Sequence, residues 1–272
     1  MADPLSLIAI GAAVGGAAGK FAEKAWESGE RWLRERFGSH AAEAQEKARE
    51  NAAGFVQQLA MRVKALEDQH KLNRERIEAT EKHPQFSALL QSTIVNAAQT
   101  DDDMKHDLLA RLVATRLVSA NESTVALASQ LASAAISHST RRQLMLMALS
   151  SFLEDMRPRD PLSVEDYRRW LEIFLERFID FEFNKIDAGH LVAIACASYD
   201  PSSDRSLEVL LQMKGGTHCI GAALNDLFVV KGLQIQWNEG LAGVFLTSVG
   251  SIVGGLTFNQ IMGRDYGLPQ WD

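Results

Sequence analysis

Histidine and cysteine are considered first, because both bind metals and a cysteine thiolate is also a nucleophile. His190 and Cys196 lie six residues apart, and His218 directly precedes Cys219. Neither pair has the spacing of C-x-x-C or H-E-x-x-H, which places two ligands on one face of a helix. We therefore expect structural roles for His190 and Cys196, and the sequence predicts no metal site.

The other reactive side chains also lack the pattern that a reaction needs. Three consecutive acids, Asp101–Asp103, precede an apolar periodic segment, as expected at a helix N-terminus, which prefers negative charge. Ser248 and Ser251 are not part of a G-x-S-x-G elbow. Lys20 ends a glycine-rich stretch that lacks the G-x-x-x-x-G-K-[ST] form of a phosphate-binding loop. The sequence thus predicts a protein that is not an enzyme and holds no cofactor; an enzyme whose site is assembled from scattered residues is the third alternative.

Composition limits the class of protein and its partners. The chain has 272 residues, of which 46% are hydrophobic and 23% are charged, as in an ordinary globular protein. Its net charge of −7 argues against general binding to nucleic acids, because affinity for phosphates comes mainly from Lys and Arg. Two cysteines fit a reducing compartment better than a disulfide-stabilised secreted domain. We expect a cytoplasmic protein.

The opening stretch LIAIGAAVGGAAGK contains Gly11, Gly15 and Gly19 at intervals of four. The chain begins MADPL, without the basic residues that start a signal peptide. The uncharged residues 5–19 form a helix about 22 Å long, which is short for a hydrocarbon core of about 30 Å. Glycines spaced by four open one helix face to a second backbone, so we expect this stretch to pack on protein. Chance placement of the glycines and a peripheral contact with a membrane are left open.

Two long helices are expected, at residues 2–37 and 40–82. In the second, Phe55, Leu59, Val63 and Leu66 recur at intervals of three and four, so they share one face. The polar face alternates in charge sign, which is typical of an exposed helix. Together with the glycines, this apolar stripe predicts self-association into a homo-oligomer. The alternative is that the stripe packs within its own domain.

The rest of the chain is predicted to be largely helical. Pro84 opens a compact helical block at residues 83–157, and RPRDPLS at 157–163, with two prolines and alternating charges, marks a boundary. We therefore expect three parts, residues 1–82, 83–157 and 164–272. The predicted fold class is mainly α: a multi-helix bundle with long N-terminal helices and a small C-terminal α+β module.

The C-terminal module resembles a winged helix. We expect a helix at residues 220–231, a hairpin of strands at 233–237 and 244–247, and a further helix at 248–262. The segments LNDLFVVKG before the hairpin and LTSVG after it resemble the end of many winged helices. The residues assigned to this module are Asn225, Trp237, Glu239, Thr247 and Gly250.

Reading DNA is the less favoured role for this module. Residues 201–272 carry six acids and four bases, and Asn225 is the only base-reading side chain on the expected recognition helix. Asp226 beside it repels phosphate. The module therefore predicts contact with an unknown protein partner, and nucleic acid is not expected as a ligand.

A broader resemblance covers the overall layout. The segment HPQFSALLQSTIVNAAQTDDDMKHDLLARLVATRL, residues 83–117, and the order of the predicted parts resemble bacterial abortive-infection alpha (Abi-alpha) proteins. This resemblance implies phage defence and supplies no catalytic residues. We expect a non-enzymatic bacterial defence protein that self-associates, in the cytoplasm or peripheral to the inner membrane. The alternative is a cytoplasmic adaptor or regulator whose winged-helix-like module binds a protein or, less favoured, DNA.

Overall fold

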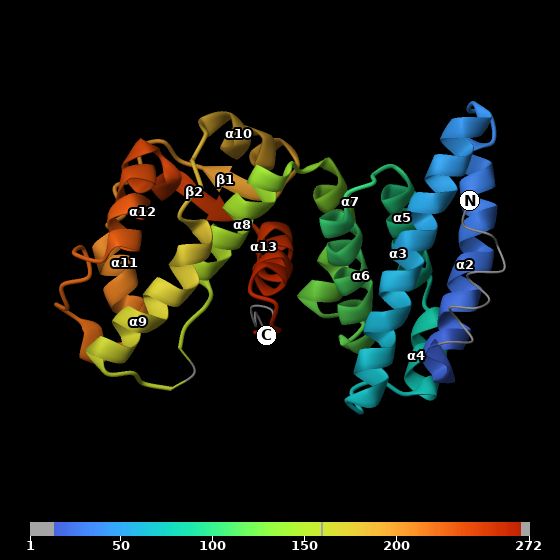
Figure 1. Ribbon diagram of the computed structural model, residues 1–272, viewed down its shortest axis with the longest axis horizontal. Helices are drawn as coiled ribbons and strands as arrows, with labels where there is room; N and C mark the ends of the chain where they lie inside the picture. The colour runs from blue at the N-terminus through green and yellow to red at the C-terminus, as the bar shows by residue number, and fades with distance from the viewer. Residues whose placement is uncertain (1–13, 159, 268–272) are drawn as a thin grey trace. The chain divides into compact units, whose positions relative to one another are not determined.

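The computed structural model describes residues 14–158 and 160–267. Within them the chain forms twelve α-helices and one two-stranded sheet, so the predicted mainly α fold class is confirmed (Figure 1). The chain divides into two compact units. The N-terminal unit ends at His138, and the C-terminal unit begins at Ser139.

The N-terminal unit is a bundle of helices built around its longest helix, α3. Helices α2, α5 and α6 pack on α3, and α7 packs on α5 and α6 (Figure 1). The helices are α2 (Gly16–Phe37), α3 (Ala42–Asp68), α4 (Arg74–Glu81), α5 (Pro84–Ala98), α6 (Asp103–Val118) and α7 (Thr124–His138). The predicted helix 40–82 is therefore two helices, and Asn73 caps the second by accepting a hydrogen bond from the N–H of Arg76 at 2.9 Å.

The apolar stripe of α3 is core. Phe55, Leu59 and Val63 have no exposed surface, and Leu66 is half-buried. The three helices that pack on α3 cover the stripe, so the expectation of an exposed face that binds a partner is wrong, and the alternative of packing within its own unit is confirmed. The spacing identified the apolar face correctly, but spacing alone does not say which chain covers it.

The glycines near the N-terminus turn the chain at the start of α2. Gly15 and Gly16 have φ of +64° and +66°, so Gly15 and Gly19 do not share one face of a continuous helix; Gly11 lies outside the described residues. The Glu67 carboxylate of α3 accepts a hydrogen bond from the N–H of Ala17 at 3.1 Å. It thus supplies an acceptor and negative charge to the helix N-terminus. None of the described helices has the length and hydropathy that a membrane span requires.

Replacing Gly15 tests this conformational role against the packing role. We expect Gly15→Ala to lower the free energy of unfolding by about 1 kcal/mol, because L-residues are disfavoured at positive φ. A Cβ at Gly15 meets no atom within 4 Å, so Gly15→Leu should cost about as much as Gly15→Ala. Chemical denaturation of the variants measures both values. A far larger loss for leucine than for alanine would instead support the packing interpretation.

The C-terminal unit is organised around the helix pair α8 and α13. The two helices pack along each other, and every residue of α13 from Val249 to Asn259 is buried. Their contact is completed by stacked aromatic rings, with Phe152 of α8 and Phe258 of α13 at a centroid distance of 5.5 Å. The helices are α8 (Arg141–Glu154), α9 (Val164–Leu175), α10 (Lys185–Ala193), α11 (Leu207–Lys214), α12 (Phe228–Glu239) and α13 (Ser248–Ile261).

The structure contains no wing hairpin within the described residues. The strand predicted at 244–247 is present as β2 (Val244–Leu246), but it pairs antiparallel with β1 (Ala197–Tyr199). The strand predicted at 233–237 is instead part of helix α12, and the helix predicted at 220–231 begins only at Phe228. Val230, Leu233 and Trp237 are buried at helical spacing, and this burial outweighs the short apolar–polar alternation of LQIQW.

The division into two units also corrects the predicted boundaries. The described residues 14–82 and 83–138 form one unit, because α3 packs on α5 and α6. The segment 157–163 lies inside the C-terminal unit. Ten of the fourteen residues of α8 are buried, and this helix packs mainly on α13. A proline-rich link thus connects two helices of the same unit here.

Candidate functional site

The residues considered for metal chemistry belong to different elements of the C-terminal unit. His190 belongs to α10 and Cys196 precedes β1, whereas His218 and Cys219 lie in a short 3-10 turn after α11. No three metal-binding side chains converge anywhere in residues 14–158 and 160–267. Asp102 caps α6, since its carboxylate accepts a hydrogen bond from the N–H of Met104 at 2.9 Å. The helix-start interpretation of the acidic run is therefore confirmed.

The segment LTSVG, residues 246–250, caps the N-terminus of α13. Thr247 Oγ1 accepts a hydrogen bond from the N–H of Gly250 at 3.2 Å and donates one to the carbonyl of Ala195 at 2.7 Å. Ser248 is the first residue of the helix, and Ser251 is buried one turn later. These side chains join β2 to α13, and they contribute to the fold and not to a wing.

The remaining residues assigned to the wing are divided between core and surface. Trp237 is buried, and its Nε1 donates a hydrogen bond to the carbonyl of Arg205 at 2.6 Å. Asn225 lies in an exposed turn before α12, and Glu239 is the exposed last residue of α12. The structure does not bring these residues together into one site.

Both thiols are poorly placed for chemistry. Cys196 and Cys219 are free and buried. Burial raises the pKa of Cys196 to about 12 and also raises the pKa of Cys219. Since the thiolate is the reactive form, these cysteines are weak nucleophiles in the folded protein.

Thiol labelling checks this conclusion. We expect a thiol reagent at neutral pH to react with the native protein at least about a hundred times more slowly than with the denatured protein, because burial limits both access and thiolate formation. Absorbance of the released aromatic thiol measures both rates. Rapid labelling of one cysteine in the native protein would show that its surroundings open readily.

A partly buried charged cluster surrounds the C-terminus of α8. Lys214 is buried, and its ammonium group donates to the carbonyl oxygens of Phe152, at 2.6 Å, and Met156. Burial lowers the pKa of Lys214 to about 7 and raises the pKa of Glu154. Arg205 forms an ion pair with Glu154 at 3.1 Å. These contacts hold α8 to the segments after it, and cations at a helix C-terminus are favourable.

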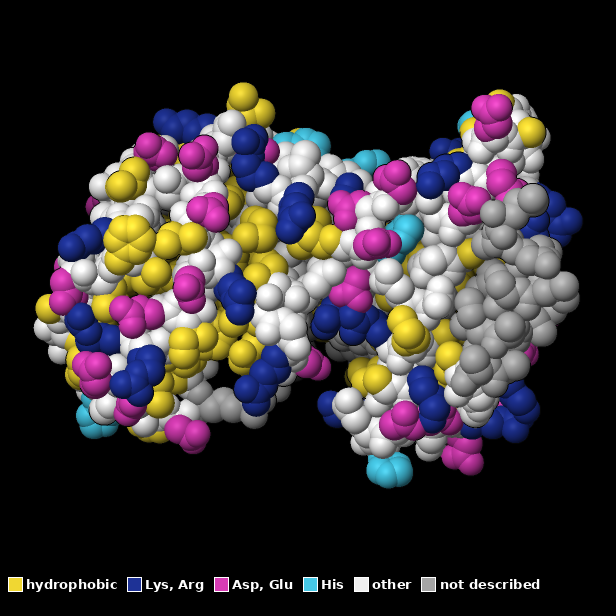
Figure 2. Space-filling view, viewed as in Figure 1, with side chains coloured by type: hydrophobic (Ala, Val, Ile, Leu, Met, Phe, Trp, Pro, Cys, Tyr) yellow, Lys and Arg dark blue, Asp and Glu magenta, His cyan; other side chains and the backbone are white. Residues whose placement is uncertain are grey.

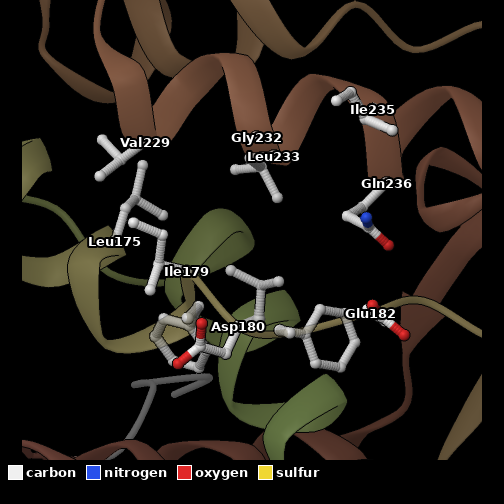
Figure 3. Close-up of a pocket in the computed structure, with 12 residues that line it drawn as sticks. Leu175, Ile179, Asp180, Glu182, Val229, Gly232, Leu233, Ile235 and Gln236 are labelled. Carbon is white, nitrogen blue, oxygen red and sulfur yellow. The ribbon is translucent and has the colours of Figure 1, made fainter.

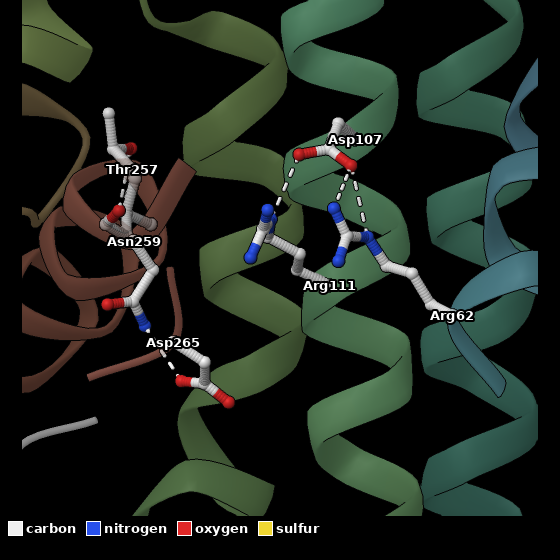
Figure 4. A network of polar contacts seen from close by, with 7 residues as sticks. Arg62, Asp107, Arg111, Thr257, Asn259 and Asp265 are labelled. Carbon is white, nitrogen blue, oxygen red and sulfur yellow. Dashed lines mark hydrogen bonds and ion pairs between the residues drawn. The ribbon is translucent and has the colours of Figure 1, made fainter. Parts of the chain in front are cut away.

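Two polar networks are also structural (Figure 4). In the N-terminal unit, Asp107 of α6 accepts hydrogen bonds from Arg62 of α3 and Arg111 of α6, so its charge is compensated on both sides. In the C-terminal unit, Asn259 donates to the Asp265 carboxylate at 3.2 Å and accepts from the N–H of Tyr266 at 3.0 Å. The second network fixes the chain that follows α13.

The strongest candidate site is a pocket of about 360 Å³ between α12 and the segment after α9. Its size falls in the range of ligand pockets. Figure 3 shows Leu233 projecting from α12 toward the segment that carries Asp180 and Glu182. The lining residues are Leu149, Leu175, Phe178, Ile179, Asp180, Phe181, Glu182, Val229, Gly232, Leu233, Ile235 and Gln236. Gln236 accepts a hydrogen bond from the N–H of Phe183, which ties the two walls together.

Apolar side chains are exposed both on the rim of the pocket and on the adjoining part of α12. Ile179 is 49% exposed and Ile235 is 59% exposed, and Phe228, at the start of α12, is 73% exposed. Phe228, Gly232 and Ile235 are spaced by four and three, so they form one face of α12. Figure 2 shows apolar side chains on the surface of this unit among charges of both signs. Contiguous exposed apolar surface marks interaction sites in soluble proteins.

Gly232 has an unusual position for a glycine. It lies in the interior of α12, where glycine costs about 1 kcal/mol relative to alanine. A Cβ at this position would meet no atom within 4 Å. The fold therefore does not require glycine there, and its absent side chain keeps the pocket open.

Neither the pocket nor the charged cluster is evident from the sequence. A glycine after an apolar segment predicts a helix end, so the sequence does not indicate that Gly232 lies inside a helix and lines a pocket. The spacing of Val230, Leu233 and Trp237 is the signal that could have shown a continuing helix. No pattern marks Lys214, because its partners are backbone carbonyls about sixty residues earlier in the chain.

A protein-family model described only as “:-like” matches residues 19–234, and the chain therefore belongs to that family. The match includes parts of both units and ten of the twelve residues that line the pocket. No curated protein and no solved structure matches the chain. The family description names neither abortive infection nor a winged helix.

Proposed function

We propose that the protein acts by binding another protein through the pocket and the exposed apolar face of α12, and that it catalyses no reaction. The observation that carries this proposal is the pocket itself, with the exposed side chains of Ile179 and Ile235 in its lining and the exposed Phe228 on the same face of α12 as Ile235. Grooves lined by an apolar helix face commonly receive an apolar segment of a partner.

The use of the reactive side chains supports a role without catalysis. Both cysteines are buried with a raised pKa, and Lys214 binds the carbonyls at the end of α8. The carboxylates of the pocket, Asp180 and Glu182, are exposed on its rim. Asp180 and Glu182 are the only titratable side chains among the residues that line the pocket, and no histidine, cysteine, serine or basic side chain lines it with them.

Photo-crosslinking in cells tests this function. A photoreactive residue at Ile235 should give a discrete adduct with another protein, and Gly232→Leu, which fills the pocket, should remove that adduct. The control position is Ile186, which is 78% exposed on α10 and does not line the pocket. No adduct at residue 235, or equal adducts at both positions, would contradict the proposed binding face.

Self-association is a separate proposal. The apolar stripe of α3 does not support it, because that stripe is buried within the N-terminal unit. In the N-terminal unit, Leu127 and Leu131 on one face of α7 are 60% and 59% exposed, which supports it. Light scattering at tens of micromolar tests it, with Leu131→Gln as the variant. A monomer across this range would exclude a stable homo-oligomer.

Phage defence is the second candidate function. It rests on residues 83–117, which form α5 and α6 and carry the resemblance to abortive-infection alpha proteins. Bacteria that carry the gene should survive phage challenge better than bacteria without it, and equal plaque counts would remove this role. Cell fractionation in the same experiment tests the proposed location, which is the cytoplasm with or without contact to the inner membrane.

A further inference from the structure

We infer that the pocket and the α12 face receive an amphipathic helix of a partner protein that carries a basic side chain beside its apolar face. This inference rests on the proposed function, because it names the chemistry of the partner that binds there. It is carried by the charge of the lining residues, by the length of the apolar face and by Gly232.

The charge of the pocket is one-sided. Of the lining residues, Asp180 and Glu182 are acidic and none is basic. The two carboxylates alternate with the buried rings of Phe181 and Phe183, so both lie on the solvent side of the segment. Neither carboxylate has an ion-pair partner in the described part of the chain. A Lys or Arg from a partner would compensate this charge, and such complementarity favours the correct partner.

The apolar face has the length that a helix can use. Phe228 and Ile235 are seven residues apart in α12, which corresponds to about 10 Å along the axis. A partner helix presents apolar residues at i, i+3, i+4 and i+7 over the same distance. Ile179 lies on the opposite wall, so apolar side chains flank the pocket on both sides.

Gly232 lies midway along this face. Because its missing side chain leaves open space, a large apolar side chain of the partner can enter between Phe228 and Ile235. The buried side chains of Leu233, Leu175 and Phe178 form the apolar floor that such a side chain would meet. Burial of one such anchor supplies much of the affinity of a helix in a groove.

Binding of two designed peptides tests the inference. The probe is a fluorescent amphipathic peptide about fourteen residues long, or four helical turns, built from leucine and lysine, and the second peptide has glutamate in place of lysine. We expect the lysine peptide to bind roughly tenfold or more tightly than the glutamate peptide by fluorescence anisotropy. Replacing both carboxylates, Asp180→Asn with Glu182→Gln, should remove most of this preference.

Two leucine variants locate the binding. Gly232→Leu should weaken binding of the lysine peptide about tenfold or more, whereas Gly189→Leu should leave it unchanged. Gly189 is a matched control, because it lies in α10 of the same unit and a Cβ there also meets no atom within 4 Å. Circular dichroism confirms that both variants are folded.

Several outcomes would overturn the inference. Equal binding of the lysine peptide to both leucine variants would place the peptide elsewhere on the surface. Equal affinity for the two peptides would show that the binding face does not select a basic side chain, and this part of the inference would be wrong. If neither peptide binds while residue 235 still crosslinks to another protein, the partner chemistry is wrong and the proposed function stands. A crosslink to a second copy of this chain would identify a different occupant.

Discussion

Gly254→Ala is expected to lower the free energy of unfolding of the C-terminal unit by about 3 kcal/mol, although alanine is the better helix former. α13 approaches α8 so closely at Gly254 that a Cβ would overlap the carbonyl oxygen of Met147. It would also lie 2.9 Å from the Cβ of Ser151. The two helices would have to separate, and the buried aromatic contacts between them would loosen.

The same exchange at Gly232 provides the control. Both glycines lie in helix interiors of the same unit, but Gly232 faces open space. Gly232→Ala should therefore raise the free energy of unfolding by about 0.5–1 kcal/mol. Urea denaturation followed by tryptophan fluorescence measures both variants. Similar effects of the two substitutions would mean that α13 does not pack closely on α8.

Gly250 extends this argument along α13. A Cβ there would overlap the carbonyl oxygen of Cys196, which also accepts a hydrogen bond from the N–H of Thr247 at 3.0 Å. The segment SVGSIVGG thus contains two glycines, four residues apart, at which another backbone approaches closely. The spacing at the N-terminus is the same, but Gly15 there turns the chain instead. The same spacing of glycines thus has two causes in this chain, close packing in α13 and a turn before α2. Only the tertiary contacts and backbone angles distinguish them.

Local signals in the sequence predicted many helices well. Pro84 begins α5, and Asp102 caps α6. Such signals act within a few residues, so they are visible without knowledge of the fold.

Local signals could not predict the pairing of β1 with β2, because β2 pairs with a strand almost fifty residues earlier in the chain. Local patterns favour a hairpin between residues 244–247 and the preceding segment 233–237. In the structure β2 pairs instead with β1, which lies far earlier in the sequence.

The candidate site was less predictable than the fold. The pocket combines residues of α8, of the end of α9 and the segment after it, and of α12, from Leu149 to Gln236 in the chain. Its lining residues are mostly aliphatic or aromatic, types that a sequence assigns to the core. What makes them a site is the exposure of Ile179 and Ile235 and the missing side chain of Gly232, and these follow from tertiary packing alone.

Stability should rise between pH 7 and 8.5 because of Lys214. Burial lowers the pKa of this lysine to about 7 in the folded protein, whereas an unfolded lysine has a pKa of about 10.4. Between these values the unfolded chain binds a proton that the folded protein does not, so the free energy of unfolding increases with pH. The increase is about 1.4 kcal/mol for each pH unit, or about 2 kcal/mol over this range.

The surroundings of Lys214 determine the sign of this effect. Desolvation is the main cause, and Arg157 adds repulsion, whereas Asp155 and Glu154 favour the charged form. The ammonium group also lies 5.1 Å from the centroid of the Phe152 ring. Cys196 and Cys219 act in the opposite direction above pH 8.5, because their pKa values are raised by folding. An unfolded thiol ionises mainly above its pKa of about 8.5, so the range from pH 7 to 8.5 keeps this opposing contribution small.

Lys214→Met is the variant that tests this account. Methionine keeps much of the length of the side chain but carries no charge, so the contribution of this site to the pH dependence should disappear. Urea denaturation of the two proteins at pH 7, 7.75 and 8.5 gives the comparison, and other titrating groups cancel between them. Because the carbonyls of Phe152 and Met156 lose their donor, the variant can be less stable at every pH. The diagnostic quantity is the slope: equal slopes for the two proteins would show that Lys214 keeps its proton in the folded protein throughout this range.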